Sequence, residues 1–141
     1  MIANDRQYQQ TRKQAAELER LLAAVQDGTA GDDGFRDLQA DALRGQLDDL
    51  RGELGDYDEL RAGSTTTIES STLAGLADAL IKARIARGWT QADLAGALGV
   101  AEQQVQRYEA TRYTGASLAR LGDIATALNV TVSETVVLLA G

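Results

Sequence analysis

Apolar residues return every three or four positions in two stretches of the first half of the chain. This spacing is that of a heptad seam, and it predicts two amphipathic helices with one apolar stripe each. Asn4 stands before the first stretch as a helix cap, with Gln7 placed to return the hydrogen bond. The first stripe comprises Tyr8, Thr11, Ala15, Leu18, Leu22 and Val25, and the second comprises Ala40, Leu43, Leu47, Leu50, Leu54 and Tyr57.

Residues 27–34 separate the two stretches with three glycines and three aspartates, which break a helix. A short break between two helices of this length predicts an antiparallel helical hairpin over residues 1–63. One apolar stripe per helix makes such a hairpin marginal on its own. We therefore expect this acidic hairpin to serve oligomerisation or partner binding.

The second half of the chain begins with residues 64–72, a run of short hydroxylated side chains without periodicity. It predicts a linker rather than the alternative, a short strand favoured by three threonines and Ile68. Ser71 or Thr72 then caps a helix over residues 73–87, and further helices are expected over 117–128 and 133–139. The apolar side of the first of these helices comprises Leu73, Leu76, Leu80, Ile81 and Ile85.

Between these helices, residues 90–109 have the pattern of two short helices joined by a tight turn. Leu94, Ala95 and Leu98 form an apolar stripe on the first helix, and Val105 and Tyr108 form one on the second. Gly99 supplies the left-handed backbone that ends the first helix. With these apolar residues turned inward, Glu102, Gln103, Gln104, Gln106 and Arg107 project from the second helix, and their side chains suit base edges in the major groove.

This segment resembles the helix-turn-helix of lambda-repressor-like (Xre-type) DNA-binding domains. The likeness rests on Thr90-Gln91, Leu94-Ala95, Leu98-Gly99-Val100, Val105 and Tyr108-Glu109, and it extends over residues 81–89 and 118–128. Residues 81–88 and 104–111 are most similar to the HigA-type antitoxin group. The chain departs from the family at residues 110–116, where it has no proline, so its loop toward the phosphates is expected to differ.

The resemblance implies that Arg84 and Glu109 form an internal ion pair, which removes Arg84 from the DNA contacts. For the five outward residues of the second helix, the alternative to base reading is a solvated face; Gln103 and Arg107, four apart, are the strongest candidates. Phosphate contacts are expected from Thr90, Gln91, Arg112 and Tyr113. Thr90 is also the expected helix cap, and Arg112 and Tyr113 have simple solvent exposure as their alternative.

Composition excludes several other functions. The chain has no cysteine and no histidine, so thiolate metal sites and histidine-based catalysis are absent, and we expect no enzyme, cofactor or metal. No apolar run has the length of a membrane span, and the first residues lack the apolar core of a signal peptide, so a cytoplasmic protein is expected.

The net charge of −7 opposes DNA binding, but it is unevenly distributed. Residues 1–70 carry 15 acidic and 8 basic side chains, whereas residues 71–141 carry 6 of each. The half that resembles a DNA-reading domain is therefore neutral. Two such domains on adjacent half-sites would be needed for useful affinity.

Together these patterns predict an all-α protein with an acidic hairpin (1–63), a linker (64–72) and a five-helix helix-turn-helix domain (73–141). The predicted function is a repressor that binds a palindromic operator in double-stranded DNA as a homodimer. The alternative is an antitoxin whose hairpin neutralises a basic toxin protein while the other domain represses their shared operon. A third reading makes the hairpin the working part and the helix-turn-helix only a scaffold.

Overall fold

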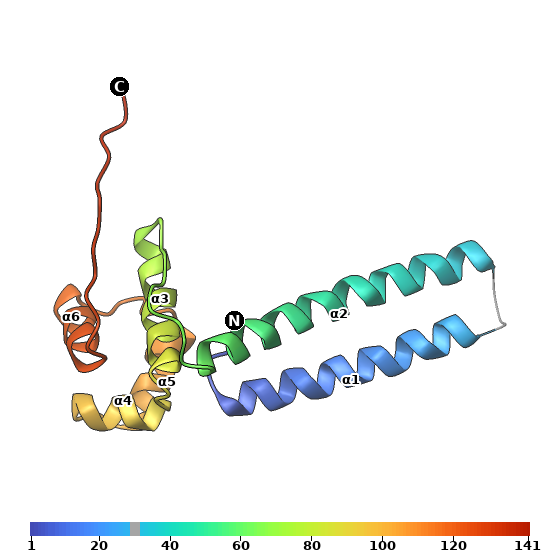
Figure 1. Ribbon diagram of the computed structural model, residues 1–141, viewed down its shortest axis with the longest axis horizontal. Helices are drawn as coiled ribbons and strands as arrows, with labels where there is room; N and C mark the ends of the chain where they lie inside the picture. Colours follow the sequence, from blue (N-terminus) through green and yellow to red (C-terminus); the bar gives the residue numbers. More distant parts are fainter. Residues whose placement is uncertain (29–31) are drawn as a thin grey trace. The chain divides into compact units, whose positions relative to one another are not determined.

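The computed structural model describes residues 1–28 and 32–141, which divide into two compact units, 1–65 and 66–141. Every regular element in the described residues is an α-helix, which confirms the predicted all-α class. In chain order these are α1 (Asp5–Asp27), α2 (Asp33–Arg61), α3 (Leu73–Ala86), α4 (Gln91–Leu98), α5 (Glu102–Ala110) and α6 (Leu118–Ala127) (Figure 1). None of the described helices is both long enough and apolar enough to cross a membrane.

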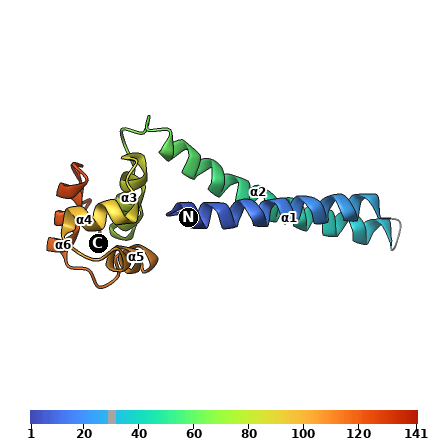
Figure 2. The same cartoon turned by 90° about the horizontal axis from the view of Figure 1, so that it is seen from below.

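The first unit is the predicted hairpin, with α1 and α2 lying side by side in both views (Figures 1 and 2). All twelve residues of the two predicted stripes are buried or half-buried, and Leu47 is only 2% exposed. Asn4 caps α1, since its side chain accepts a hydrogen bond from the Gln7 amide at 2.9 Å. Of the predicted break at 27–34, residues 29–31 lie outside the described part of the chain.

Two tyrosines close the open end of this hairpin. The rings of Tyr8 and Tyr57 lie 5.2 Å apart, at a distance typical of favourable aromatic pairs. Each hydroxyl donates to a carboxylate on the opposite helix, Tyr8 to Asp58 and Tyr57 to Asp5, both at 3.1 Å. The seam is therefore anchored by cross-helix hydrogen bonds as well as by apolar contact.

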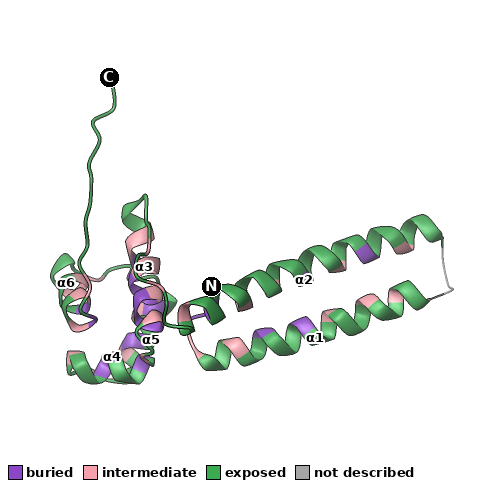
Figure 3. Cartoon of the chain, in the orientation of Figure 1, coloured by how far each residue is buried: buried purple, intermediate pink, exposed green. Residues whose placement is uncertain are grey.

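The second unit packs α3, α4, α5 and α6 around one core. Figure 3 shows its buried positions gathered on the inner sides of these short helices. Its most buried apolar side chains are Leu80, Ile81, Leu94, Ala95, Val105, Ile124 and Leu128. Thr72, Thr90 and Ser117 cap α3, α4 and α6 with side-chain hydrogen bonds. Leu73, expected on the apolar side of the first helix, is instead 85% exposed because it is the first residue of α3 and lies beyond the core.

The expected helix over residues 133–139 is not formed, so the second unit has four helices where five were predicted. Val132, Thr135, Val136 and Val137 are β-branched, and such side chains lose rotamer freedom in a helix. No core surface of this unit covers the segment, since every residue from 131 to 141 is exposed. Residues 64–70 also lack regular structure, as a linker does, and do not form the alternative strand.

Candidate nucleic-acid interface

Helices α4 and α5 are joined by a tight turn at Gly99. Gly99 has φ +70° and ψ +31°, the left-handed conformation that glycine adopts at little cost. The Val100 amide then donates to the Ala95 carbonyl at 3.0 Å, which closes the end of α4. Ala95 is 2% exposed and Val105 has no exposed surface. These two side chains therefore pack α4 and α5 against the core.

The outer face of α5 carries the predicted row of polar side chains. Glu102, Gln103, Gln106 and Arg107 are exposed, whereas Gln104 is half-buried. Gln106 Nε2 donates to Glu102 Oε1 at 3.3 Å, which joins two of them along the helix. Side chains of these types can form hydrogen bonds with base edges, and Arg107 suits the bidentate pairing with guanine.

The charges of the second unit leave Arg107 available. Arg84 pairs with Glu109, Arg112 with Asp78 and Arg120 with Asp123. Arg87 donates to the carbonyls of Leu128 and Asn129 at 3.0 and 2.7 Å. Within the described residues, Arg107 and Lys82 are the two cations of this unit without an ion pair or a side-chain hydrogen bond. Arg107 is thus a free cation on the exposed face of α5.

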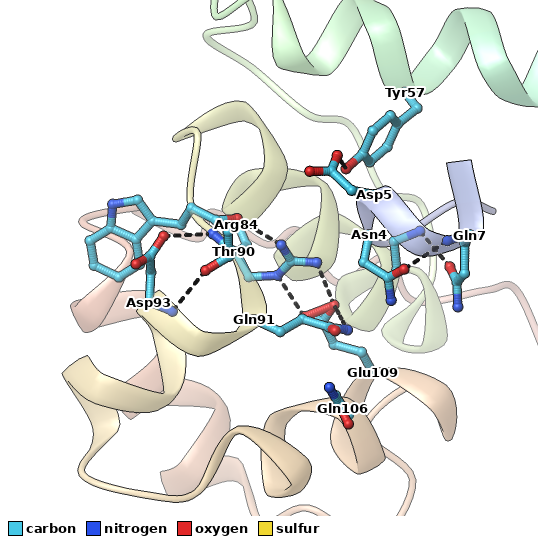
Figure 4. A network of polar contacts seen from close by, with 12 residues as sticks. Asn4, Asp5, Gln7, Tyr57, Arg84, Thr90, Gln91, Asp93, Gln106 and Glu109 are labelled. Atoms are coloured by element: carbon cyan, nitrogen blue, oxygen red, sulfur yellow. Dashed lines mark hydrogen bonds and ion pairs between the residues drawn. The ribbon is translucent and has the colours of Figure 1, made fainter. Parts of the chain in front are cut away.

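A buried ion pair fixes α5 to α3 (Figure 4). Arg84 Nε lies 2.7 Å from Glu109 Oε2 and Arg84 Nη2 lies 2.6 Å from Glu109 Oε1, as expected for this pair. The Arg84 and Glu109 side chains are 2% and 1% exposed. Arg84 Nη1 also donates to the Trp89 carbonyl at 2.7 Å, so the guanidinium holds the end of α3 as well. A bidentate pair in a dry site allows little rotation, and the last turn of α5 is fixed in place.

Gln91 belongs to this network and does not face outward. Its side chain is 7% exposed, and its Nε2 donates to Glu109 Oε1 at 3.2 Å. The predicted phosphate contact through the Gln91 side chain is therefore inconsistent with its position. The glutamine at the first turn of α4 positions Glu109 instead, a role that depends on a residue 18 positions away and is invisible to local spacing.

Thr90 is the helix cap rather than a free ligand. Its Oγ1 accepts from the Asp93 amide at 3.1 Å, and its own amide donates to Asp93 Oδ2 at 2.8 Å, which makes a complete capping box. The hydrogen bond from the Thr90 amide to the Asp93 carboxylate lowers the pKa of Asp93, and the Thr90 side chain lowers it further. The Thr90 amide donates and its Oγ1 accepts within this capping box, so Thr90 has a structural role at the start of α4.

The loop after α5 also departs from expectation. Tyr113 is 5% exposed, its ring stacks on Tyr108 with centroids 5.8 Å apart, and its burial raises the pKa of the hydroxyl. The prediction that Tyr113 contacts phosphate or solvent is therefore wrong for this conformation. Arg112 is exposed, but its Nη1 donates to both carboxylate oxygens of Asp78, at 2.9 and 2.7 Å. A phosphate contact by Arg112 would have to replace this ion pair.

Two structural roles were not predicted from the sequence. Arg87 stabilises the carboxyl end of α6, where a cation is favoured by the unpaired carbonyls. Arg112 and Tyr113 both adopt positive φ, at +51° and +58°, which non-glycine residues seldom do. The absence of a proline in residues 110–116 was the available signal that this loop is unusual.

Within the described residues, no three His, Cys, Asp or Glu side chains are grouped to hold a metal ion.

Comparison with known proteins finds a family model that is similar to part of the second unit. No curated protein and no solved structure matches the chain. Residues 80–134 match a family model described as Helix-turn-helix; the match begins at Leu80 within α3, continues through α6 and includes the turn at Gly99. This part of the chain is therefore similar to Xre-type, lambda-repressor-like helix-turn-helix domains, a likeness that supports a DNA-binding transcriptional regulator.

Proposed function

We propose that the protein is a sequence-specific repressor that inserts α5 into the major groove of an operator. The observation that carries the proposal is the position of Arg107, an exposed and unpaired guanidinium on a helix whose opposite side is fixed by the Arg84–Glu109 pair. Preorganised side chains lose less conformational entropy on binding. The base-reading set proposed here is Glu102, Gln103, Gln104, Gln106 and Arg107, with Gln104 the least exposed member.

The start of α5 supports a contact with the DNA backbone. Ala101 precedes the helix and provides no side-chain cap, so the first amides of α5 have no side-chain acceptor. Amides at a helix N-terminus bind phosphate oxygens readily. In this proposal α5 approaches the duplex with its amino end, and Gln103 and Arg107 point to base edges one turn apart.

Homodimerisation follows from the charge of the reading unit. Residues 71–141 carry as many acidic as basic side chains, and among their described cations only Lys82, Arg87 and Arg107 lack an ion pair. Few phosphates can be neutralised by one such unit, so its non-specific affinity is low. Two units on a palindromic operator supply the missing affinity by avidity, since the second unit binds from a high effective concentration.

A second candidate function, an antitoxin, is supported by the separate hairpin. The hairpin is a compact unit of its own whose apolar stripes are closed against each other. Its outer surface carries exposed acidic residues on α2, which suit a basic partner: Asp48, Asp49, Glu53, Asp56, Asp58 and Glu59. Under this proposal the hairpin neutralises a toxin while α5 represses the shared operon.

Selection of bound duplexes from a random DNA library tests the repressor proposal. The full chain should enrich one sequence, and that sequence should contain two inverted half-sites about one helical turn apart, or a multiple of that spacing. Arg107→Ala should lose the enrichment. Arg120→Ala is the matched control, because Arg120 lies on α6 and pairs with Asp123. No enriched sequence, or equal enrichment by the Arg107→Ala protein, would reject DNA reading by α5.

The antitoxin proposal needs a different measurement. If a small basic protein is encoded beside its gene, the full chain should bind it, and Asp48→Asn with Glu53→Gln should weaken that complex without changing DNA affinity. Because neither residue lies in the second unit, a loss of DNA binding in this variant would contradict the division of labour between the units.

A further inference from the structure

The turn directly after α5 places an arginine where helices usually end in a glycine. The Arg112 amide donates to the Glu109 carbonyl at 3.1 Å, and the Tyr113 amide donates to the Tyr108 carbonyl at 2.7 Å. These two hydrogen bonds close a helix through one residue of left-handed backbone, which is most often glycine. Here that residue is Arg112, at φ +51°, and Tyr113 follows at φ +58°. Two successive residues with side chains are therefore held in an unfavourable backbone conformation.

The two side chains of this turn lie in opposite environments. Tyr113 is buried, with its ring stacked on Tyr108, and its hydroxyl has no hydrogen-bond partner in the described chain. The Arg112 side chain is 59% exposed. Packing therefore accounts for Tyr113 but not for the arginine beside it. Backbone strain of this kind is concentrated at functional sites, which points to a role for the exposed arginine.

Arg112 contacts α3 through a carboxylate. Its Nη1 donates to Asp78 Oδ1 at 2.9 Å and to Asp78 Oδ2 at 2.7 Å, and the Asp78 side chain is 30% exposed. Because both groups reach water, the pair contributes little stability and another anion can replace the carboxylate. The oxygens of a DNA phosphate accept the same charge-assisted hydrogen bonds from a guanidinium.

The position of Arg112 relative to the proposed reading residues suits a phosphate contact. Arg112 follows Arg107 by five residues, which is roughly 7.5 Å along a helix axis. The major groove is about 12 Å wide. An arginine at this distance beyond a base-reading side chain reaches the phosphates that border the groove. The carboxylate of Asp78 and a backbone phosphate therefore compete for one guanidinium.

We propose that Asp78 is autoinhibitory: its carboxylate holds Arg112 in the free protein and is displaced by a backbone phosphate when α5 docks on DNA. Breaking the Asp78–Arg112 pair opposes phosphate binding, so the affinity for every DNA sequence is lowered alike. The second unit holds most of its other cations in the same manner, on carboxylates or carbonyls. The inference rests on the proposed function, because it needs α5 at the DNA surface.

Binding of the full chain to a labelled duplex of mixed sequence tests the proposal, because phosphate contacts carry no sequence information. At low salt, Asp78→Asn should bind this duplex roughly twofold to fivefold more tightly than the unaltered protein, the equivalent of one exposed ion pair. Asp78→Ala should do the same and serves as a second variant. Asp123→Asn is the matched control, since it removes an equal charge whose nearest approach to Arg120 is 3.9 Å. Trp89 fluorescence verifies folding of each protein.

Arg112→Ala separates autoinhibition from simple charge repulsion. This variant should bind the duplex more weakly than the unaltered protein, and the salt dependence should fall by about one phosphate contact. In the Arg112→Ala background, Asp78→Asn should lose its effect, because no guanidinium remains to be released. Repulsion between Asp78 and the phosphates would instead give the same gain in both backgrounds.

An equal gain in both backgrounds, or no gain from either Asp78 variant beyond that of Asp123→Asn, would overturn the inference. So would an Arg112→Ala protein that binds the duplex as tightly as the unaltered protein. These outcomes do not depend on base reading by Arg107, because the duplex offers no preferred site. A chain that selects no operator but shows the gain from Asp78→Asn would reject the repressor and leave autoinhibition standing. Failure of every variant to bind the duplex would reject both.

Discussion

Arg84 and Glu109 meet through two hydrogen bonds of 2.7 and 2.6 Å, although they lie 25 positions apart and are almost fully buried. Gln91 adds a third contact to the same carboxylate, from Nε2 to Oε1 at 3.2 Å. The network therefore joins α3, α4 and α5 at one point. Its consequence is that the orientation of the proposed reading helix depends on a charge pair that never touches DNA.

Arg84→Met should destabilise the second unit by on the order of 3–5 kcal/mol, because Glu109 is left charged in a dry site. The double variant Arg84→Met with Glu109→Leu should recover part of this loss. Urea unfolding followed by fluorescence of Trp89, the one tryptophan in the chain, measures both changes. Strictly additive effects of the two single substitutions would contradict direct coupling.

Gly99→Ala should cost about 1–2 kcal/mol of stability, because an alanine at φ +70° is strained although nothing lies within 4 Å of the added methyl. Gly96→Ala is the matched control. Gly96 also has nothing within 4 Å, but it lies inside α4 without the positive φ, so alanine should stabilise the protein by about 0.5–1 kcal/mol. Equal effects in urea melts would show that backbone conformation at the turn is unimportant.

Tyr113→Phe should be neutral or stabilising by up to about 3 kcal/mol at pH 7. The Tyr113 hydroxyl is buried, and no hydrogen-bond partner for it exists in the described chain. Folding of the wild-type protein therefore removes water from this hydroxyl without replacing the lost hydrogen bonds. A marked destabilisation by Tyr113→Phe in the same urea melts would show that the hydroxyl is paired.

Alkaline pH provides a second test at this position. Burial raises the pKa of Tyr113 above its ordinary value of 10.0, so the folded state keeps the proton while the unfolded state releases it. The contribution of this raised pKa to the free energy of unfolding is fully present below about pH 10, and it is lost as the pH rises from there toward the folded-state pKa. The stability difference between Tyr113→Phe and the wild type should therefore widen above pH 10. A constant difference between pH 7 and pH 11 would argue against a buried Tyr113.

Periodicity was sufficient to predict the hairpin and the outer face of α5. Every stripe residue of α1 and α2 is buried or half-buried, because in a two-helix hairpin the spacing of apolar residues alone decides which side is covered. The exposure of Glu102, Gln103, Gln106 and Arg107 follows from the burial of Val105 in the same way.

The residues whose positions were predicted wrongly depend on contacts between distant parts of the chain or on backbone conformation. Gln91 is buried because Glu109 attracts its amide, and Tyr113 is buried because two residues with positive φ turn its ring onto Tyr108. Neither effect leaves a periodic pattern. At residues 133–139 the apolar character was read as a helix, although the β-branched residues around Val136 favour an extended chain.

The base preference of the unaltered protein and of Arg107→Ala, measured on the selected operator and on its single-base variants, tests the central claim most directly. Fluorescence anisotropy at fixed salt should show that Arg107→Ala weakens specific binding by about 1–3 kcal/mol per half-site and abolishes discrimination at one base pair, because one bidentate contact is lost. Discrimination at the other positions should persist. If Arg107→Ala binds every variant with the affinities of the unaltered protein, α5 does not read DNA through this side chain and the account is wrong.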